Sequence, residues 1–249
     1  MANYRKTIII DVETGGLDPS KDSLLEVCIK ELNGKVLLNT LVSNTEQLNI
    51  NPSALDINQL DEENIKKNGI SDFDCYNKIR NILINLNQED ENTKKSLNLS
   101  PDFAISGKNV IFDINFIKEL FKRHNDELDN YIERYRFLEI DTLLLSHEIR
   151  NNMTFPNLSL ENVCNHFKID FIPHRAYNDV IASEKLLNKL INNKRTLQEI
   201  LFKVYSINPQ LIFFNVDFHR ECEKEAGHKI NFIQFMDAKQ TYLGSKKEK

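Results

Sequence analysis

The chain opens with three short strand-like segments joined by tight turns. Residues 7–10 read Thr-Ile-Ile-Ile, a β-branched run with no helical period, and Gly15-Gly16 breaks the pattern soon afterwards. Two more apolar segments follow, residues 24–32 and 35–42, and only Asn33-Gly34 separates them. Asn-Gly between apolar runs is a strong hairpin signal, because both residues accept the positive φ that a tight hairpin turn requires. The sequence therefore predicts three strands that are antiparallel neighbours.

Beyond this hairpin the apolar positions change to a helical period. Residues 72–86 place apolar side chains three and four positions apart, and Ser71 with Asp74 forms a capping pair at the start. Residues 88–101 are polar and charged, which predicts a solvated loop. The remaining pattern predicts strands over residues 103–106 and 136–140 and helices over residues 112–124, 142–150, 158–167 and 176–191.

Three hairpin-like strands followed by alternating strands and helices predict an α/β domain with a mixed central β-sheet flanked by helices. We assign this domain to residues 1–195. The character of the sequence then changes to a helix, an apolar run and a charged tail, so we assign residues 196–249 to a C-terminal extension. Within it, residues 211–214 are apolar and aromatic and predict a core strand.

Composition limits the class of protein. Of the 249 residues, 41% are hydrophobic and 28% are charged, as in a folded globular protein. No apolar run approaches the roughly 18–20 residues that span a bilayer, and no secretory signal precedes the first strand, so we expect a cytoplasmic protein with no membrane partner. The four cysteines lie far apart with no Cys-x-x-Cys pair, which predicts reduced thiols.

The formal net charge of −5 argues against tight, sequence-independent binding of nucleic acid. It does not argue against an acidic metal site, because four carboxylates and two divalent cations nearly cancel in charge. The charge balance therefore leaves a metal-dependent enzyme open.

Asp11 and Glu13 end the first predicted strand. Side chains alternate along a strand, so these two carboxylates project from the same face. Neighbouring carboxylates repel each other unless a cation lies between them, and open α/β sheets bind ligands at the carboxyl ends of their strands. By itself Asp-x-Glu is a weak signal, because two solvated acids at the end of a strand give the same pattern.

Two later segments carry acids in comparable settings. Asp113 opens a predicted helix on the face of its inward apolar residues, where a carboxylate is costly unless it is paired or binds a metal. A first-turn acid that interacts with the helix dipole is the alternative. His174 precedes another predicted helix and Asp179 lies one turn into it, an arrangement that a surface imidazole and a capping acid also produce.

Together these segments resemble the three motifs of the DEDDh exonucleases, a family that includes the DNA polymerase III proofreading subunit and RNase T. Residues 10–17, Ile-Asp-Val-Glu-Thr-Gly-Gly-Leu, resemble the first motif, and residues 109–116, Asn-Val-Ile-Phe-Asp-Ile-Asn-Phe, resemble the second. Residues 174–179 match the third, His-x4-Asp. The resemblance extends in order over residues 5–192. It departs from the family at Lys108 and Asn58, where many members have histidine.

The resemblance implies a ribonuclease H-like exonuclease fold and a two-metal-ion 3′→5′ exonuclease. Such an enzyme hydrolyses phosphodiester bonds at the 3′ end of DNA or RNA and releases nucleoside 5′-monophosphates. By resemblance, Asp11, Glu13, Asp113 and Asp179 would hold two Mg²⁺ or Mn²⁺ ions, hard cations that suit carboxylate oxygens. His174 would act as the general base. An unperturbed imidazole has a pKa of about 6.5, so that role predicts activity that rises from about pH 6 to 8.

The resemblance also implies the partners. The nucleic-acid partner is a single-stranded or frayed 3′ end, and a DNA polymerase is a further candidate if the chain acts in proofreading or DNA repair. Thr14, Gly15, Leu17 and Asn109 are the candidate contacts of the terminal nucleotide. The alternative function is a catalytically silent exonuclease fold that binds nucleic acid or docks on a polymerase. All four carboxylates and the histidine are present, which favours the active enzyme.

Overall fold

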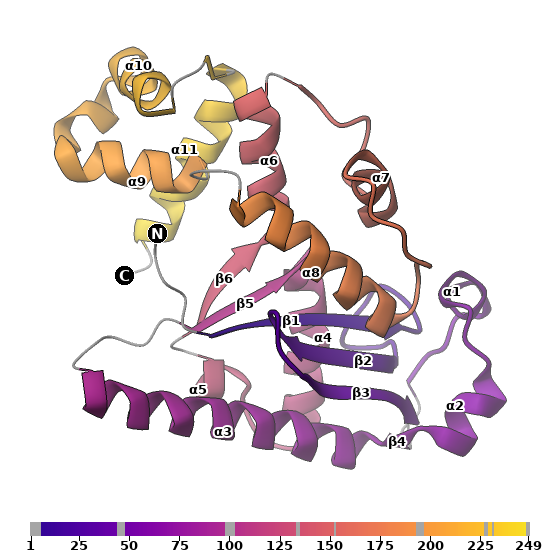
Figure 1. Cartoon of the computed structure of the whole chain (residues 1–249). Coiled ribbons are helices and arrows are strands. Elements are labelled where there is room, and N and C mark those ends of the chain that lie inside the picture. The colour runs from indigo at the N-terminus through magenta and orange to yellow at the C-terminus, as the bar shows by residue number, and fades with distance from the viewer. Residues whose placement is uncertain are drawn as a thin grey trace. The chain divides into compact units, whose positions relative to one another are not determined.

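Figure 1 shows the computed structural model of the chain. The residues that the structure describes are 6–43, 48–97, 103–132, 135–151, 153–192, 197–226, 229–230 and 232–247. They form two compact units, each described by itself below. The first unit is Met1–Glu139 with Lys168–Lys185, and the second is Ile140–Phe167 with Leu186–Lys249.

A six-stranded mixed sheet with the order β4-β3-β2-β1-β5-β6 forms the centre of the first unit (Figure 1). Its strands are β1 (Lys6–Thr14), β2 (Leu24–Glu31), β3 (Val36–Ser43), β4 (Ile70–Ser71), β5 (Phe103–Gly107) and β6 (Tyr135–Glu139). β1, β2 and β3 are antiparallel neighbours, while β5 and β6 extend the sheet in parallel from β1. The predicted opening of three antiparallel strands and the predicted mixed sheet are both confirmed.

The hairpin between β2 and β3 turns at Asn33-Gly34, as predicted. Asn33 has a φ of 56°, in the left-handed region that asparagine tolerates better than most residues. The Gly34 N–H donates to the Glu31 carbonyl at 3.0 Å, which closes the turn. The turn sets the register of β2 against β3 and therefore decides which side chains of β2 share a face.

The alternation along β1 gives the sheet two different faces. Ile8, Ile10 and Val12 join the main hydrophobic core. On that side the sheet packs against α3 (Asp72–Leu97) and α4 (Val110–Arg123), whose largest fully buried side chains are Phe116 and Phe121. The opposite face of β1 carries the acids and receives the start of α8 (Ala176–Asn192).

Helix α3 is longer than the sequence pattern predicted. The predicted helix ended at residue 86 and a loop was expected over residues 88–101, but α3 continues to Leu97. Residues 88–97 contain no glycine or proline and are rich in Gln, Glu and Lys, which have good helix propensity. A polar segment can therefore extend a helix beyond the core that nucleates it, and the expectation of a loop was wrong for these residues; residues 98–101 lie outside the described part.

The second unit is helical. It contains α6 (Ile140–Asn151), α7 (Leu160–His166), α9 (Leu197–Ile207), the 3-10 helix η1 (Pro209–Phe213), α10 (Asn215–Ala226) and α11 (Phe232–Lys247). Its core is made by Leu201, Val204, Ile212, Phe218, Cys222, Ile230 and Phe235. Among the described residues no helix combines the length and apolar character needed to cross a membrane.

The prediction of a core strand over residues 211–214 was wrong. Asn208 accepts a hydrogen bond from the Gln210 N–H at 3.2 Å and Pro209 stands at the first helical position, so the segment starts a helical turn. Ile212 is buried, but Phe213 and Phe214 are 76% and 60% exposed. A helical turn at the surface buries only the side chains on its inner side, here Ile212. The predicted core strand would have buried the whole apolar run.

The short helices α1 (Pro52–Asn58), α2 (Glu62–Asn68) and α5 (Asp129–Ile132) complete the first unit. α1 begins after Asn51, whose side chain accepts from the Ser53 N–H at 3.0 Å. The Asn51 N–H donates to the Gly15 carbonyl at 2.8 Å, which places α1 beside the end of β1. α1 therefore borders the acidic end of that strand.

Candidate active site

Asp11 and Glu13 lie on one face of β1, as predicted from strand alternation. In the register of the sheet Asp11 is opposite Cys28 and Glu13 is opposite Glu26, both on β2. Glu13 is only 8% exposed and Glu26 only 3%. Like charges directly across an antiparallel pair are destabilising, so this face of the sheet requires compensating positive charge.

Asp179 contributes a third carboxylate from the first turn of α8. Carboxylate oxygens of Asp11, Glu13 and Asp179 all lie within 4.8 Å of one another. We call these three residues the acidic cluster. The Oδ1 atom of Asp179 is buried and has no hydrogen-bond partner among the described residues. A buried unpaired carboxylate oxygen is costly, so its position indicates a ligand other than a side chain.

Asp113 lies next to the acidic cluster but is anchored differently. It is 4% exposed, and its Oδ1 accepts a hydrogen bond from the Val12 N–H at 2.9 Å. Burial raises its pKa well above the usual range, although backbone hydrogen bonds, including that from Val12, lower it. The predicted inward position of Asp113 on its helix is therefore observed.

Burial and mutual repulsion hinder ionisation of the acidic cluster. Burial raises the pKa of Asp11 well above its usual range, and the charges of Asp113 and Asp179 raise it further. Burial raises the pKa of Glu13 to about 8, with Asp179 as the next cause. Burial raises the pKa of Asp179 to about 7, although a hydrogen bond from the His174 backbone lowers it. A divalent cation would favour the ionised form of each acid.

These residues fit a divalent metal site. The cluster offers hard carboxylate oxygens, which suit Mg²⁺ and Mn²⁺. The unpaired Oδ1 of Asp179 leaves one of those oxygens available in the interior. No other group of three His, Cys, Asp or Glu with comparably close ligand atoms was found in the described part of the chain.

His174 lies at the edge of the acidic cluster, two residues before the start of α8. Its side chain is exposed, and its backbone has a φ of 65°, a left-handed conformation that is uncommon for a residue other than glycine. Its backbone N–H hydrogen-bonds to the carboxylate of Asp179. The predicted pair of histidine and aspartate is therefore joined through the backbone, and the imidazole remains accessible to solvent.

The predicted nucleotide contacts at the end of β1 have different surroundings. Thr14 is buried, and its carbonyl accepts from Asn58 Nδ2 at 3.0 Å. A Cβ added at Gly15 would lie 2.6 Å from the Asn49 carbonyl oxygen, so only glycine fits there. Leu17 is 84% exposed. The Leu17 side chain is thus exposed to solvent, next to a backbone that contacts Asn58 at Thr14 and Asn49 at Gly15.

The fourth predicted contact, Asn109, precedes α4 with a φ of 54°. Asparagine is one of the few side chains that adopt this conformation readily. It stands at the start of the same helix that carries Asp113. The left-handed backbone at the start of α4 thus accounts for an asparagine at position 109, whether or not its side chain contacts a nucleotide.

Sequence reasoning missed Glu26 and Arg175. Arg175 Nε and Nη2 donate to the two Glu26 oxygens at 3.1 and 2.9 Å. A charged residue in the middle of the apolar strand β2, on the same face as the acids of β1, was the available signal. The alternation rule that grouped Asp11 with Glu13 does not reveal which residue of a neighbouring strand is opposite them.

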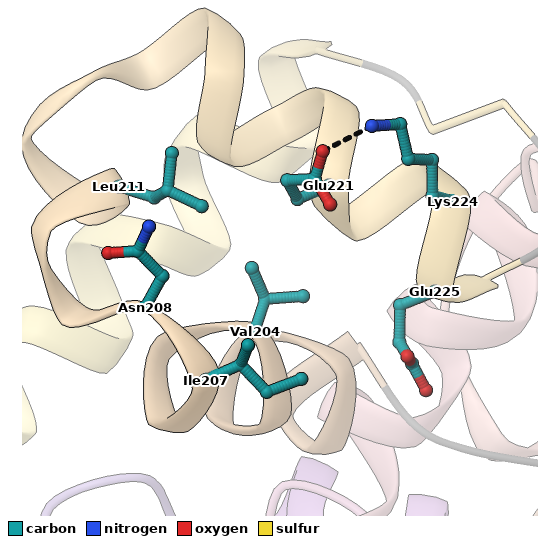
Figure 2. A pocket seen from close by; sticks show the side chains of 7 residues that line it. All are labelled: Val204, Ile207, Asn208, Leu211, Glu221, Lys224 and Glu225. Carbon is teal, nitrogen blue, oxygen red and sulfur yellow. Dashed lines mark hydrogen bonds and ion pairs between the residues drawn. The ribbon is translucent and has the colours of Figure 1, made fainter.

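A separate pocket lies in the helical unit (Figure 2). Its volume is about 200 Å³, and it is lined by Val204, Ile207, Asn208, Leu211, Glu221, Lys224 and Glu225. Glu221 pairs with Lys224 in Figure 2, and Glu225 pairs with Lys203 at 2.7 Å. Its carboxylates are thus neutralised by lysines, unlike those of the acidic cluster, and none of the predicted site residues lines it.

Comparison with known proteins gives a consistent result. An exonuclease family model, RNase T, matches residues 8–187. DNA polymerase III subunit epsilon of Buchnera aphidicola subsp. Baizongia pistaciae is 26% identical over 205 residues, which cover 80% of this chain and 74% of that protein. Ribonuclease T of Haemophilus influenzae (strain KW20 / Rd) is 26% identical over 201 residues, 76% of this chain and 81% of that protein.

Solved structures agree on the fold. E. coli Exonuclease I in complex with a dT13 oligonucleotide matches with a TM-score of 0.62 at 14% identity, over 85% of this chain and 43% of that one. The chain therefore spans less than half the length of Exonuclease I, and this likeness supports the ribonuclease H-like fold alone. The family match covers most of the chain and includes Asp11, Glu13, Asp113, His174 and Asp179. The chain belongs to the RNase T family of exonucleases and carries the 3′→5′ exonuclease domain of that family.

Proposed function

We propose that the protein removes nucleotides from the 3′ end of DNA or RNA by two-metal-ion hydrolysis and releases nucleoside 5′-monophosphates. The observation that supports this most directly is the acidic cluster, in which Asp11, Glu13 and Asp179 lie within 4.8 Å of one another and Asp179 Oδ1 has no partner among the described residues. In a member of an exonuclease family, three converging carboxylates, of which Glu13 is buried and Asp11 and Asp179 are half-buried, are best explained as metal ligands.

Asp11, Glu13, Asp113 and Asp179 hold two Mg²⁺ or Mn²⁺ ions. When bound, the ions supply a more acidic water and neutralise charge that develops on the departing 3′ oxygen.

His174 accepts the proton of the attacking water. Its side chain is exposed, and the hydrogen bond from its backbone N–H to the Asp179 carboxylate ties the residue to a proposed metal ligand. Only an imidazole with an unprotonated ring nitrogen can accept this proton.

The terminal nucleotide lies against the backbone of Thr14 and Gly15. Leu17, which is 84% exposed, offers an apolar contact to a base, and Asn109 offers an amide. The partner is a single-stranded or frayed 3′ end. Contacts of this kind do not distinguish the sugar, so both DNA and RNA are candidate substrates.

The first experiment uses 5′-labelled single-stranded DNA and RNA of the same sequence. The purified protein is incubated with Mg²⁺, Mn²⁺ or EDTA, beside Asp11→Asn and a control, Asp72→Asn, which changes a buried carboxylate outside the acidic cluster. We expect a metal-dependent ladder that shortens from the 3′ end in the wild type and the control only, with nucleoside 5′-monophosphate as the product. A folded, metal-loaded wild type that degrades neither substrate would favour the silent binding module instead.

Association with a DNA polymerase is a second proposal, and the epsilon subunit among the relatives supports it. We assign the contact to residues 196–249, where Phe213 and Phe214 expose large aromatic surfaces. Co-purification with a polymerase that the double variant Phe213→Ser/Phe214→Ser abolishes, without loss of exonuclease rate, is the expected result. Undiminished co-purification by the double variant would refute this assignment.

A further inference from the structure

Strand β2 carries two charged side chains inside the fold. Glu26 and Lys30 are 3% and 7% exposed and share the face of β2 that lies beside Asp11 and Glu13. A buried charge is costly unless an opposite charge and hydrogen bonds compensate it. Both of these residues find their partners on α8 or directly before it, so the pairs connect the strand to the helix that carries Asp179.

Glu26 holds the start of α8 by three hydrogen bonds. Arg175 donates from Nε and Nη2 to the two carboxylate oxygens at 3.1 and 2.9 Å, a two-point contact that restricts orientation as well as distance. The Ala176 N–H donates to Glu26 Oε2 at 3.1 Å. A backbone N–H in the first turn of a helix lacks an intrahelical partner. The Glu26 carboxylate, which lies on β2, accepts this N–H and so caps the N-terminus of α8.

Lys30 holds the same helix further along. Its Nζ lies 2.5 Å from Glu184 Oε1, and that oxygen also accepts from the Asn33 N–H at 2.6 Å. Lys30 lies four positions after Glu26, a distance of roughly 13 Å along a strand. Glu184 lies nine positions after Arg175, a distance of roughly 13.5 Å along a helix. The two pairs therefore match in spacing and set one register between α8 and β2.

The first pair lies at the turn that presents the catalytic groups. Arg175 is the residue between His174, with its left-handed φ of 65°, and Ala176, the first residue of α8. The Arg175 carbonyl accepts the Asp179 N–H at 3.0 Å. Any rotation of Arg175 therefore shifts His174 on one side and Asp179 on the other.

We propose that Glu26 and Arg175 are positioning residues that hold His174 and Asp179 against Asp11 and Glu13. This inference rests on the proposed function. The Lys30–Glu184 pair supplies attachment of the helix to the sheet, and the Glu26–Arg175 pair sets the geometry of the turn. Arg175 also compensates the charge of Glu26, which lies directly opposite Glu13 in the sheet.

The test compares two double variants that each remove a buried ion pair with no change in net charge. Glu26→Ala/Arg175→Ala removes the positioning pair. Asp72→Ala/Arg123→Ala removes a similar pair, 3.0 Å between Arg123 Nε and Asp72 Oδ2, which joins α3 to α4 away from the acidic cluster. Because each double variant removes both members of its ion pair, both are expected to fold with a lowered melting temperature.

Three measurements are made well below each melting temperature: kcat and KM on 5′-labelled single-stranded DNA, Mn²⁺ affinity by calorimetry, and amide hydrogen exchange of residues 172–185 without metal. For the positioning pair we expect kcat to fall at least about tenfold with KM within about threefold, weaker Mn²⁺ binding and faster exchange, because small displacements of catalytic groups cost large factors in rate. Arg175→Lys keeps the charge without the two-point contact, so it should recover only part of kcat.

The control double variant should lower the melting temperature and leave kcat, Mn²⁺ affinity and exchange of residues 172–185 unchanged. If the positioning double variant behaves like the control, the inference is overturned and the pair only stabilises the fold. If the wild type itself degrades neither DNA nor RNA, the proposed function fails, while Mn²⁺ affinity and amide exchange still report whether the pair orders the acidic cluster.

Discussion

Asp113 Oδ1 accepts a hydrogen bond of 2.9 Å from the Val12 N–H, and this bond joins two segments that are 101 residues apart in the chain. Val12 stands between Asp11 and Glu13, so the bond holds the stretch of β1 that carries two acids of the cluster. Asp113 therefore has a structural bond to make as well as a charge to contribute, and the two can be separated by mutation.

Asp113→Asn keeps an oxygen that can accept the Val12 N–H but removes the charge. We expect its free energy of unfolding to equal or exceed that of the wild type without metal, because burial disfavours the ionised carboxylate. Its kcat should fall at least about 100-fold, because loss of a residue that only hydrogen-bonds to a metal ligand already costs about 10- to 100-fold. Asp113→Ala loses the acceptor too and should be destabilised by about 1–3 kcal/mol. Equal destabilisation of both variants in urea would contradict this separation.

The raised pKa values of Glu13, about 8, and Asp179, about 7, predict how stability depends on pH. Both acids keep their protons in the fold at pH values where the unfolded chain has released them. The folded state therefore binds more protons, and the free energy of unfolding of the metal-free protein falls as pH rises from about 4 to 8. Thermal unfolding in EDTA should show this slope, and Glu13→Gln should reduce it.

Metal should reverse that loss of stability. A cation competes with protons for the same carboxylates, so the increase in melting temperature on addition of Mn²⁺ is expected to be larger at pH 8 than at pH 6. An increase that does not depend on pH would indicate that Mn²⁺ binds elsewhere on the protein.

The strands and the order of the motifs could be predicted from the sequence because both depend on local patterns. A β-branched run predicted β1, and Asn33-Gly34 predicted the hairpin. The same face for Asp11 and Glu13 followed from strand alternation alone. These features require no knowledge of how distant segments meet.

Contacts between distant segments could not be predicted in this way. Glu26 and Arg175 are 149 positions apart, and only the register of the sheet and the course of α8 bring them together. The exposure of Phe213 depends equally on tertiary structure, since an apolar run is compatible with a buried strand or with one turn of helix. The C-terminal end of α3 is a different case. Its apolar pattern stops at residue 86, but residues of good helix propensity continue the helix to Leu97.

His174 can be tested by the rate at saturating metal. His174→Ala should be slower by about 10²–10⁴-fold, the usual contribution of a general base. His166→Gln, which changes an exposed histidine of the helical unit, should keep the wild-type rate. An undiminished rate in His174→Ala, with the protein folded and loaded with metal, would assign the proton transfer to another group.

Asn58 holds the backbone of Thr14, which borders the acidic cluster. Many DEDDh exonucleases have histidine at the matching position. Its Nδ2 donates to the Thr14 carbonyl at 3.0 Å, and its side chain is 7% exposed. Asn58→Asp replaces this donor by an acceptor of the same shape and places a carboxylate against a carbonyl oxygen. We expect KM for single-stranded DNA to rise about tenfold, because Thr14 no longer holds its place beside the terminal nucleotide, while Mn²⁺ affinity stays within about threefold. Asn58→His retains a donor and should lie between Asn58→Asp and the wild type. An unchanged KM in Asn58→Asp, with the protein folded, would show that the Thr14 backbone does not contact the substrate.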